Sequence, residues 1–290
     1  MNQLGAVCVL DDFGTLRFSG ADVEKFLQGQ LSNDVSKLPP GALLRAGMHN
    51  PQGRTLALLW LVAADHGDIL AVLPFELLST VTTQLRRYVL RAKVTISDDS
   101  AQYRICGLAA PDASSALAGR QVAYGPRDEP RVLLLQSVLE PPPSGPAISR
   151  DQWRGLDIAA GLAQVYAATS GQFVAQMLNL DCIDAISFTK GCYTGQEVIA
   201  RAHYRGRIKR RLQRFRSRSA LRLAAGDVGR LEDGRSFRVV EATQHADGSC
   251  EFLAVASLPG AAQEADETSQ LLPSQGVAYT ALPLPYALPE

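Results

Sequence analysis

Strand-sized apolar segments that end in turn signals constrain the fold of this chain more than any other feature. Residues 43–48 and 54–62 flank Asn50-Pro51-Gln52-Gly53, a tight-turn sequence, and together they predict an antiparallel hairpin. Residues 75–90 instead place apolar side chains at helical spacing, which predicts an amphipathic helix, and a second helix is expected over residues 23–31. Because hairpins and helices are mixed along the chain, the pattern predicts an α+β fold and not a doubly wound sheet.

The rest of the chain predicts a division into two parts. A hairpin is expected over residues 8–18, with its turn at Asp11-Asp12-Phe13-Gly14. From residue 212 onward, short strand-like pieces separated by Asp-Gly turns predict a small barrel or sandwich. We therefore predict a composite region of two α+β lobes over residues 1–212, with a proline-rich linker near 141–146, and a C-terminal β-barrel domain over residues 213–290.

Composition is that of an ordinary soluble globular protein, with 46% apolar and 20% charged residues. The formal net charge is zero, so the overall charge predicts no class of partner. We expect no secretory signal and no membrane span, because no apolar run approaches the roughly 20 residues that a bilayer requires. The five cysteines are scattered and odd in number, which favours reduced thiols, a cytoplasmic location and no metal site.

One octet, Lys190-Gly191-Cys192-Tyr193-Thr194-Gly195-Gln196-Glu197, stands apart because no folding rule requires it. Its cysteine lies between two glycines, which favours a tight turn outside the core. Basic neighbours such as Lys190 and Arg201 are expected to lower the pKa of the thiol. Cys192 is therefore a candidate reactive or metal-binding thiol, with His203 as a candidate base. The alternative is that Cys192 is a small, half-buried turn residue and that His203 lies on the surface.

A basic run follows the octet, with nine lysines and arginines and no acid between Arg201 and Arg218. Such a run can contact phosphate, polyglutamate or nucleic acid. The alternative is a strand whose outer face is solvated. The run is composed of Arg201, Arg205, Arg207, Lys209, Arg210, Arg211, Arg214, Arg216 and Arg218.

Two aromatic residues, Phe13 and Trp153, lie beside polar turn residues. An exposed aromatic edge can stack on a flat heterocycle, whereas the alternative for both is ordinary core packing. The acids Asp181, Asp184 and Glu197 could bind a ring nitrogen or a metal, but they are spread over the chain without a recognisable ligand spacing.

The octet resembles the signature of the YgfZ family, folate-binding proteins related to the glycine-cleavage aminomethyltransferase. The resemblance extends nearly from end to end, because further blocks fit the family as well. These blocks are residues 26–35, 50–54, 88–94, 187–211 and 283–286.

This resemblance implies aminomethyltransferase-like lobes in a ring around a central hole that takes tetrahydrofolate or a one-carbon derivative. It also implies a role in assembling or repairing iron–sulfur proteins, including the enzymes that thiolate tRNA. Trp153 and Phe13 match the two tryptophan positions associated with the family's folate pocket, and Phe13 keeps a stacking face but loses the indole N–H. Cys192 matches the family's characteristic cysteine. The other candidate cofactor-binding residues are Lys190, Tyr193, Gln196, Glu197 and Arg201.

The chain also departs from the aminomethyltransferases. Their carboxylate pair after the turn has no acidic counterpart over residues 54–58, and their pterin-binding glutamate is replaced by Ala159. Missing carboxylates remove an acceptor for the pterin and a charge for an iminium-like centre. The resemblance therefore predicts a folate-binding accessory protein and not a conventional enzyme. Two alternatives remain: a one-carbon transferase with another substrate, and a tRNA-binding protein that uses Arg201–Arg218.

Overall fold

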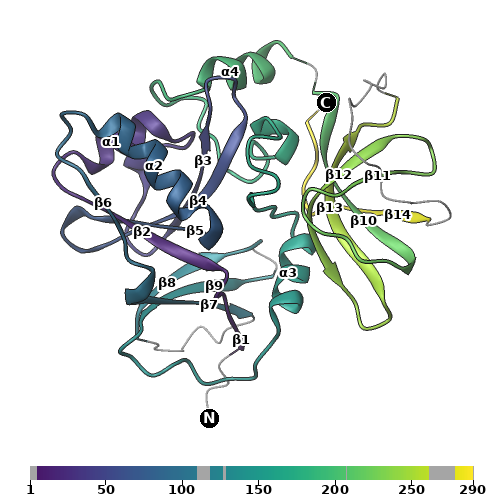
Figure 1. Ribbon diagram of the computed structural model, residues 1–290, viewed down its shortest axis with the longest axis horizontal. Helices are drawn as coiled ribbons and strands as arrows, with labels where there is room; N and C mark the ends of the chain where they lie inside the picture. The colour runs from purple at the N-terminus through teal and green to yellow at the C-terminus, as the bar shows by residue number, and fades with distance from the viewer. Residues whose placement is uncertain (1–4, 110–117, 127–128, 207, 261–277, 290) are drawn as a thin grey trace.

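The computed structural model describes residues 5–109, 118–126, 129–206, 208–260 and 278–289, and these form three antiparallel sheets and four α-helices (Figure 1). The short 3₁₀ helices are η1 (Val35–Lys37), η2 (Asp65–Gly67), η3 (Phe75–Leu77), η4 (Ser100–Gln102) and η5 (Ala175–Leu178). The mixture of sheets and helices agrees with the predicted α+β class. The sequence also predicts a helix over residues 113–117, and this segment lies outside the described residues.

The first sheet has the strand order β3-β4-β5-β2-β6 and contains the predicted hairpin. Its strands are β2 (Phe13–Ser19), β3 (Leu43–His49), β4 (Thr55–Ala63), β5 (Ile69–Pro74) and β6 (Thr95–Asp98). The β3–β4 register runs from Leu43 opposite Val62 to His49 opposite Thr55. Helices α1 (Val23–Gln30) and α2 (Leu78–Val89) confirm the two predicted helices, and their apolar sides join the same core cluster as this sheet.

The second sheet has the order β1-β7-β9-β8 and packs on the opposite face of the first. Its strands are β1 (Ala6–Val9), β7 (Tyr103–Ala109), β8 (Arg120–Tyr124) and β9 (Arg131–Ser137). Leu59 and Leu61 of β4 therefore lie in one core cluster, whereas Trp60 and Val62 lie in the other. Burial on both faces explains why the sequence of β4 is apolar almost throughout, since side chains alternate between the faces of a sheet.

The predicted hairpin over residues 8–18 is wrong. Phe13 N–H does donate to the carbonyl of Leu10 at 3.2 Å, as in a turn. However, β1 pairs with β7, and β2 pairs with β5 and β6, so the two strands enter different sheets. Local turn signals could not reveal this, because each strand finds its partner more than 50 residues away.

Helix α3 (Arg150–Ala159) lies between the second sheet and the C-terminal sheet (Figure 1). Ser149 begins it with a capping box, in which its hydroxyl accepts from Gln152 N–H and the Gln152 side chain accepts from Ser149 N–H. The predicted proline linker precedes this helix and is fixed to β1. Val7 N–H donates to the carbonyl of Pro146 at 2.7 Å, and Ile148 N–H donates to that of Val7 at 2.9 Å.

The C-terminal sheet has the order β11-β12-β13-β10-β14. Its strands are β10 (Arg210–Ala220), β11 (Val228–Arg230), β12 (Ser236–Gln244), β13 (Ser249–Ser257) and β14 (Tyr279–Leu282). One face buries an aromatic cluster around Phe237 and Phe252, and the other sends Leu253 and Val255 into the largest core cluster. Among the described residues, β11 and β14 remain the two edges, so these strands form an open sheet and not a closed barrel.

The fourth helix, α4 (Gln196–Tyr204), begins at the end of the octet. From the sequence alone, residues 197–205 are compatible with either a helix or an extended segment. Within the described part of the chain, no helix has the length and apolar character needed to cross a membrane.

Candidate functional site

Lys190 fixes the octet to the end of α1. Its ammonium donates to the backbone carbonyls of Gln28 at 2.8 Å, Leu31 at 2.7 Å and Asn33 at 2.7 Å. Burial lowers the pKa of Lys190 to about 8. Since an ammonium has three hydrogens to donate, these three bonds occupy it fully. The structure therefore gives Lys190 an anchoring position, although the sequence predicted it among the cofactor-binding residues.

Two glycines join the octet to the Asn50–Gly53 turn. Gly195 has φ +83°, and a Cβ there would lie 2.5 Å from the carbonyl oxygen of Asn50. Gly53 has φ +71°, and a Cβ there would lie 3.0 Å from Val198 on the first turn of α4. Both positions combine a left-handed backbone with close packing, which only glycine meets without strain. Two motifs that lie some 140 residues apart in the sequence thus form one unit.

The remaining octet residues differ in exposure. Tyr193 is buried, its ring centroid lies 5.2 Å from Lys190 Nζ, and burial raises its pKa to about 12. Gln196 accepts from Tyr193 N–H at 3.3 Å, which closes the turn before α4. Glu197 and Arg201 lie on the outer side of α4, with side chains 91% and 74% exposed and 3.9 Å apart. Their predicted contact with a cofactor remains a prediction.

Cys192 is the exposed cysteine of this chain, because Cys8, Cys106 and Cys250 are buried and Cys182 is half-buried. It makes no hydrogen bond within the described part of the chain. His203, the candidate base, instead stacks on Phe188 with ring centroids 3.7 Å apart. Among the described residues, no three His, Cys, Asp or Glu side chains gather as a metal site. The octet thus presents an accessible thiol on an anchored loop.

A cavity of about 330 Å³ lies beside the octet, and we call it the signature pocket. It is lined by Gln30, Met48, His49, Asn50, Pro51, Leu56, Gln84, Arg87, Tyr88 and Thr194. These residues come from α1, from the β3–β4 hairpin, from the end of α2 and from the octet. Four of the five sequence blocks that carry the family resemblance thus contribute residues to this pocket. The sequence analysis did not predict the pocket, although these shared blocks could have indicated it.

The predicted aromatic pair lies elsewhere, in a row of four stacked or edge-on rings that we call the aromatic ladder. Ring centroids are 4.7 Å apart for Phe13 and Trp60, 5.1 Å for Trp60 and Tyr124, and 5.8 Å for Tyr124 and Trp153. The expectation of exposed faces is not met, because Phe13 is 6% and Trp153 0% exposed. Both pack in the core between the first two sheets. Trp60 supplies an indole beside Phe13, and sequence reasoning missed it because it lies within an apolar strand.

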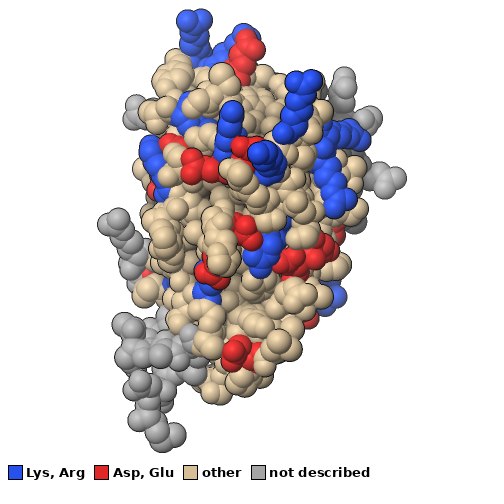
Figure 2. Space-filling view, turned by 90° about the vertical axis from the view of Figure 1, so that its left-hand side faces the viewer, with Lys and Arg blue, Asp and Glu red and all other residues tan. Residues whose placement is uncertain are grey.

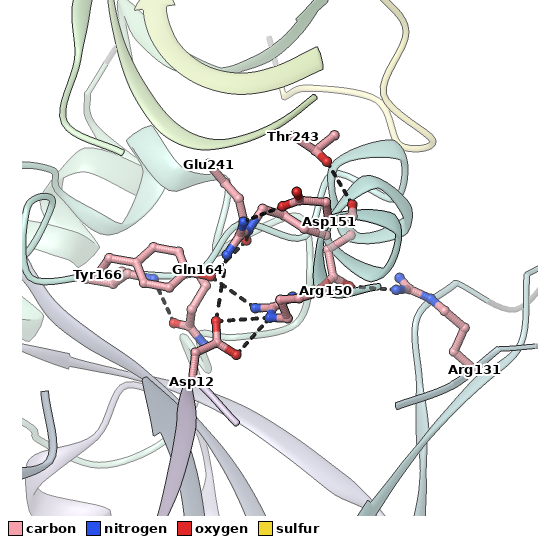
Figure 3. A network of polar contacts seen from close by, with 11 residues as sticks. Asp12, Arg131, Arg150, Asp151, Gln164, Tyr166, Glu241 and Thr243 are labelled. Carbon is pink, nitrogen blue, oxygen red and sulfur yellow. Dashed lines mark hydrogen bonds and ion pairs between the residues drawn. The ribbon is translucent and has the colours of Figure 1, made fainter. Parts of the chain in front are cut away.

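A buried polar network adjoins this ladder, and Figure 3 shows it between β2, α3 and β12. We call it the seam network: Asp12, Arg150, Arg154, Gln164, Tyr166 and Glu241. Arg150 Nε donates to both carboxylate oxygens of Asp12, at 2.8 and 3.0 Å, and its guanidinium carbon lies 5.3 Å from the centre of the Phe13 ring.

Glu241 closes the seam network from the C-terminal sheet. It accepts from the hydroxyl of Tyr166 at 2.9 Å and lies 3.4 Å from Arg154 Nε. Burial raises the pKa of Glu241 to about 7. Four buried polar atoms here have no partner among the described residues. They are Arg150 Nη1, Trp153 Nε1, Gln164 Nε2 and Glu241 Oε2.

Three arginines of the basic run that follows the octet form ion pairs within the protein. Arg211 forms a buried ion pair with Asp181 at 2.9 Å. Arg214 pairs with Glu251 at 2.6 Å, and Arg216 pairs with Asp247 at 2.8 Å. Because these carboxylates come from elsewhere in the sequence, the run contributes less free positive charge than its composition predicts.

The fold belongs to the aminomethyltransferase-like class. The glycine cleavage system aminomethyltransferase T from Bartonella henselae superimposes with a TM-score of 0.65 at 12% sequence identity, and the match covers 88% of this chain and 79% of that one. A likeness at this identity defines the fold alone.

Sequence comparison defines the family more closely. A scan against protein-family models finds no match. The tRNA-modifying protein YgfZ of Sodalis glossinidius (strain morsitans) is 32% identical over 308 residues, which cover 97% of this chain and 93% of that protein. The chain therefore belongs to the YgfZ family.

Proposed function

We propose that this protein is a tetrahydrofolate-binding accessory protein that supports tRNA modification through iron–sulfur proteins, and that it does not transfer aminomethyl groups. The name of its relative supports the link to tRNA modification, and the aminomethyltransferase-like fold supports folate binding. The proposal includes the ring of lobes around a central hole and the domain boundary near residue 212.

The unpartnered polar atoms of the seam network are the observation that carries this proposal. A reduced pterin has N–H donors on one edge and a carbonyl acceptor beside them. The seam network has Glu241 Oε2 as a free acceptor and Arg150 Nη1 and Gln164 Nε2 as free donors. Each unsatisfied buried group costs about 1–3 kcal/mol, so a ligand that satisfies several of them is stabilised by the same amounts.

The residues present therefore fit a pterin without the family's usual glutamate. Glu241 of β12 supplies a carboxylate from a different element than the one that carries Ala159. Phe13 and Trp153 would support the site from the aromatic ladder, and Arg201 would meet the anionic glutamate tail. When bound, tetrahydrofolate supplies a carrier for one-carbon units. The exposed thiol of Cys192 offers a sulfur ligand or nucleophile to a cluster, a sulfur species or a partner's thiol.

Titration with tetrahydrofolate tests the folate part directly. Both tryptophans of the chain lie in the aromatic ladder, so tryptophan emission reports on this region. We expect a saturable change in emission, with a Kd raised about tenfold or more in Gln164→Leu and Glu241→Gln, which remove one free group each. Gln244→Leu at the exposed end of β12 is the matched control. Unchanged emission together with no calorimetric heat at high ligand concentration would contradict folate binding.

Complementation tests the role of the thiol. In a strain that lacks the gene, iron–sulfur enzyme activity and tRNA thiolation should be restored by the parent and by Cys182→Ser, but not by Cys192→Ser. Cys182 is the suitable control because it is a half-buried thiol that hydrogen-bonds to Asp181 at 3.7 Å. Full restoration by Cys192→Ser would show that the sulfur has no chemical role.

A further inference from the structure

We propose that the signature pocket binds a nucleotide, either free or as an unpaired residue of an RNA. This proposal does not depend on folate binding, because the pocket shares no residue with the seam network. Its ligand class follows from the lining, from one buried histidine and from the charge at the rim.

The lining is neutral and rich in groups that both donate and accept. Gln30, Asn50, Gln84 and Thr194 supply amides and a hydroxyl, and no carboxylate lines the pocket. Asn50 Oδ1 already accepts from Arg54 N–H at 2.9 Å, which leaves its amide N–H groups to donate. A nucleobase edge combines donors and acceptors in one plane, so side-chain amides are well suited to read it.

His49 provides the strongest indication of a missing ligand. His49 is among the residues that line the pocket, it is 2% exposed, and both of its ring nitrogens are buried without a partner among the described residues. The ring packs over Gly47, where a Cβ would lie 2.4 Å from Nε2. Burial lowers the pKa of His49 to about 3, so its imidazole is neutral and has one donor and one acceptor. A planar ligand in the pocket toward which the imidazole turns would offset the cost of burying an unpartnered nitrogen.

The rim adds an aromatic face and positive charge. Tyr88 is 47% exposed, and base stacking on such a ring contributes about 1–3 kcal/mol. Arg87 is exposed beside it and makes no ion pair within the described part of the chain. Residues 77–97 include Arg86, Arg87, Arg91 and Lys93 but no acid. Figure 2 shows the side of the molecule that carries α1 and α2, with lysine and arginine side chains gathered over its upper part.

These features favour a nucleotide over an acidic peptide. A peptide carboxylate would use the cations at the rim but would leave the neutral amides and the imidazole unused. A nucleotide uses both, since its phosphate meets Arg87 and its base meets the neutral lining. The predicted basic run is the weaker candidate, because Arg211, Arg214 and Arg216 already pair with carboxylates.

The test uses the purified full-length protein and four probes: nucleoside monophosphates, a single-stranded RNA 12-mer, the matching duplex and poly-glutamate. The variants are His49→Phe, Gln84→Leu and Arg87→Gln, and the control is Arg222→Gln, an exposed arginine on the C-terminal sheet side. We expect His49→Phe to weaken binding at least tenfold while the protein stays as stable as the parent or more so, since the substitution removes an unsatisfied buried group. Gln84→Leu should act in the same direction without changing a buried residue.

Salt dependence separates the roles of the rim and the lining. Arg87→Gln should reduce the slope of log K against log salt by about one, whereas His49→Phe and Arg222→Gln should leave that slope unchanged. Tighter binding of single-stranded RNA than of mononucleotides assigns an RNA residue as the occupant, and equal binding assigns a free nucleotide. The proposal is overturned if His49→Phe and Gln84→Leu bind like the parent, if duplex or poly-glutamate competes equally well, or if no probe binds at millimolar concentration.

Discussion

The seam network and the signature pocket differ in the kind of polar side chains that they place near the core. In the seam network, charged groups from the turn before β2, from α3 and from β12 are buried or partly buried and pair at 2.8–3.7 Å. In the signature pocket, the lining residues other than Arg87 are neutral, and Arg87 makes no ion pair with the described residues. Buried charges require partners, whereas neutral amides can remain available. The difference indicates that ion pairs hold the unpartnered groups of the seam network in position, whereas the neutral amides of the signature pocket stay available without such pairs.

The largest loss of stability is expected when one partner of the buried ion pair between β9 and α3 is removed. Arg131 and Asp157 form an ion pair at 2.7 Å, with side chains 3% and 7% exposed. Arg131→Leu leaves the carboxylate without its partner, so the free energy of unfolding should fall by about 3–5 kcal/mol in chemical denaturation. The double variant with Asp157→Leu should recover most of this loss.

The exposed pair on α4 is the matched control. Arg201→Ala removes an ion pair of 3.9 Å, and we expect a change below about 0.5 kcal/mol. Equal losses at the two pairs would show that burial does not set the cost of breaking an ion pair in this protein.

A smaller effect should appear as a pH dependence at Glu241. Its pKa rises from 4.5 to about 7 on folding, so the folded state binds the extra proton in that window and stability falls as pH increases from 4.5 to 7. The contribution is about 3 kcal/mol across the window. Glu241→Gln should remove it, so the parent should lose stability relative to the variant as pH rises. Parallel stability curves for both proteins would refute the proposed burial of this carboxylate.

The third prediction concerns the two glycines of the octet. Gly195→Ala introduces a Cβ at φ +83° and 2.5 Å from a carbonyl oxygen, so it should cost about 2 kcal/mol and disturb the signature pocket. Gly191→Ala is the control, because its Cβ would meet no atom within 4 Å. Thermal unfolding of both variants checks this. Similar melting temperatures would mean that the octet and the Asn50–Gly53 turn do not depend on each other.

Local patterns predicted the elements better than their pairing. The β3–β4 hairpin and the helices α1 and α2 follow from turn residues and apolar spacing, which act within about ten residues. The hairpin over residues 8–18 failed because β1 and β2 have partners in different sheets. The alternative interpretation of the basic run, a strand with inward apolar residues, holds for residues 210–218, where Leu212 and Phe215 are buried. The ion pairs of this strand depend on carboxylates about 30 residues away in the sequence, which no local pattern reveals.

The same limit applies to the site residues. The octet identified Cys192 as a turn cysteine, and the structure finds it exposed. The anchoring role of Lys190 could not be predicted from the octet, because the three carbonyls that accept from it lie at the end of α1 and just after it. The sequence analysis did not select Trp60 as a site residue, because a tryptophan within an apolar strand looks like any other core residue. Its position beside Phe13 depends on how two sheets pack.

The sequence by itself determined the family, the α+β class and the glycine-flanked thiol, since motifs and hydrophobic period are properties of neighbouring residues. Only the tertiary structure decided that the aromatic pair is buried, that three arginines of the basic run are paired and that four distant blocks enclose a pocket around His49. The physical reason is that burial and charge pairing depend on contacts between segments from about 30 to 160 residues apart, and those contacts exist only once the sheets have packed.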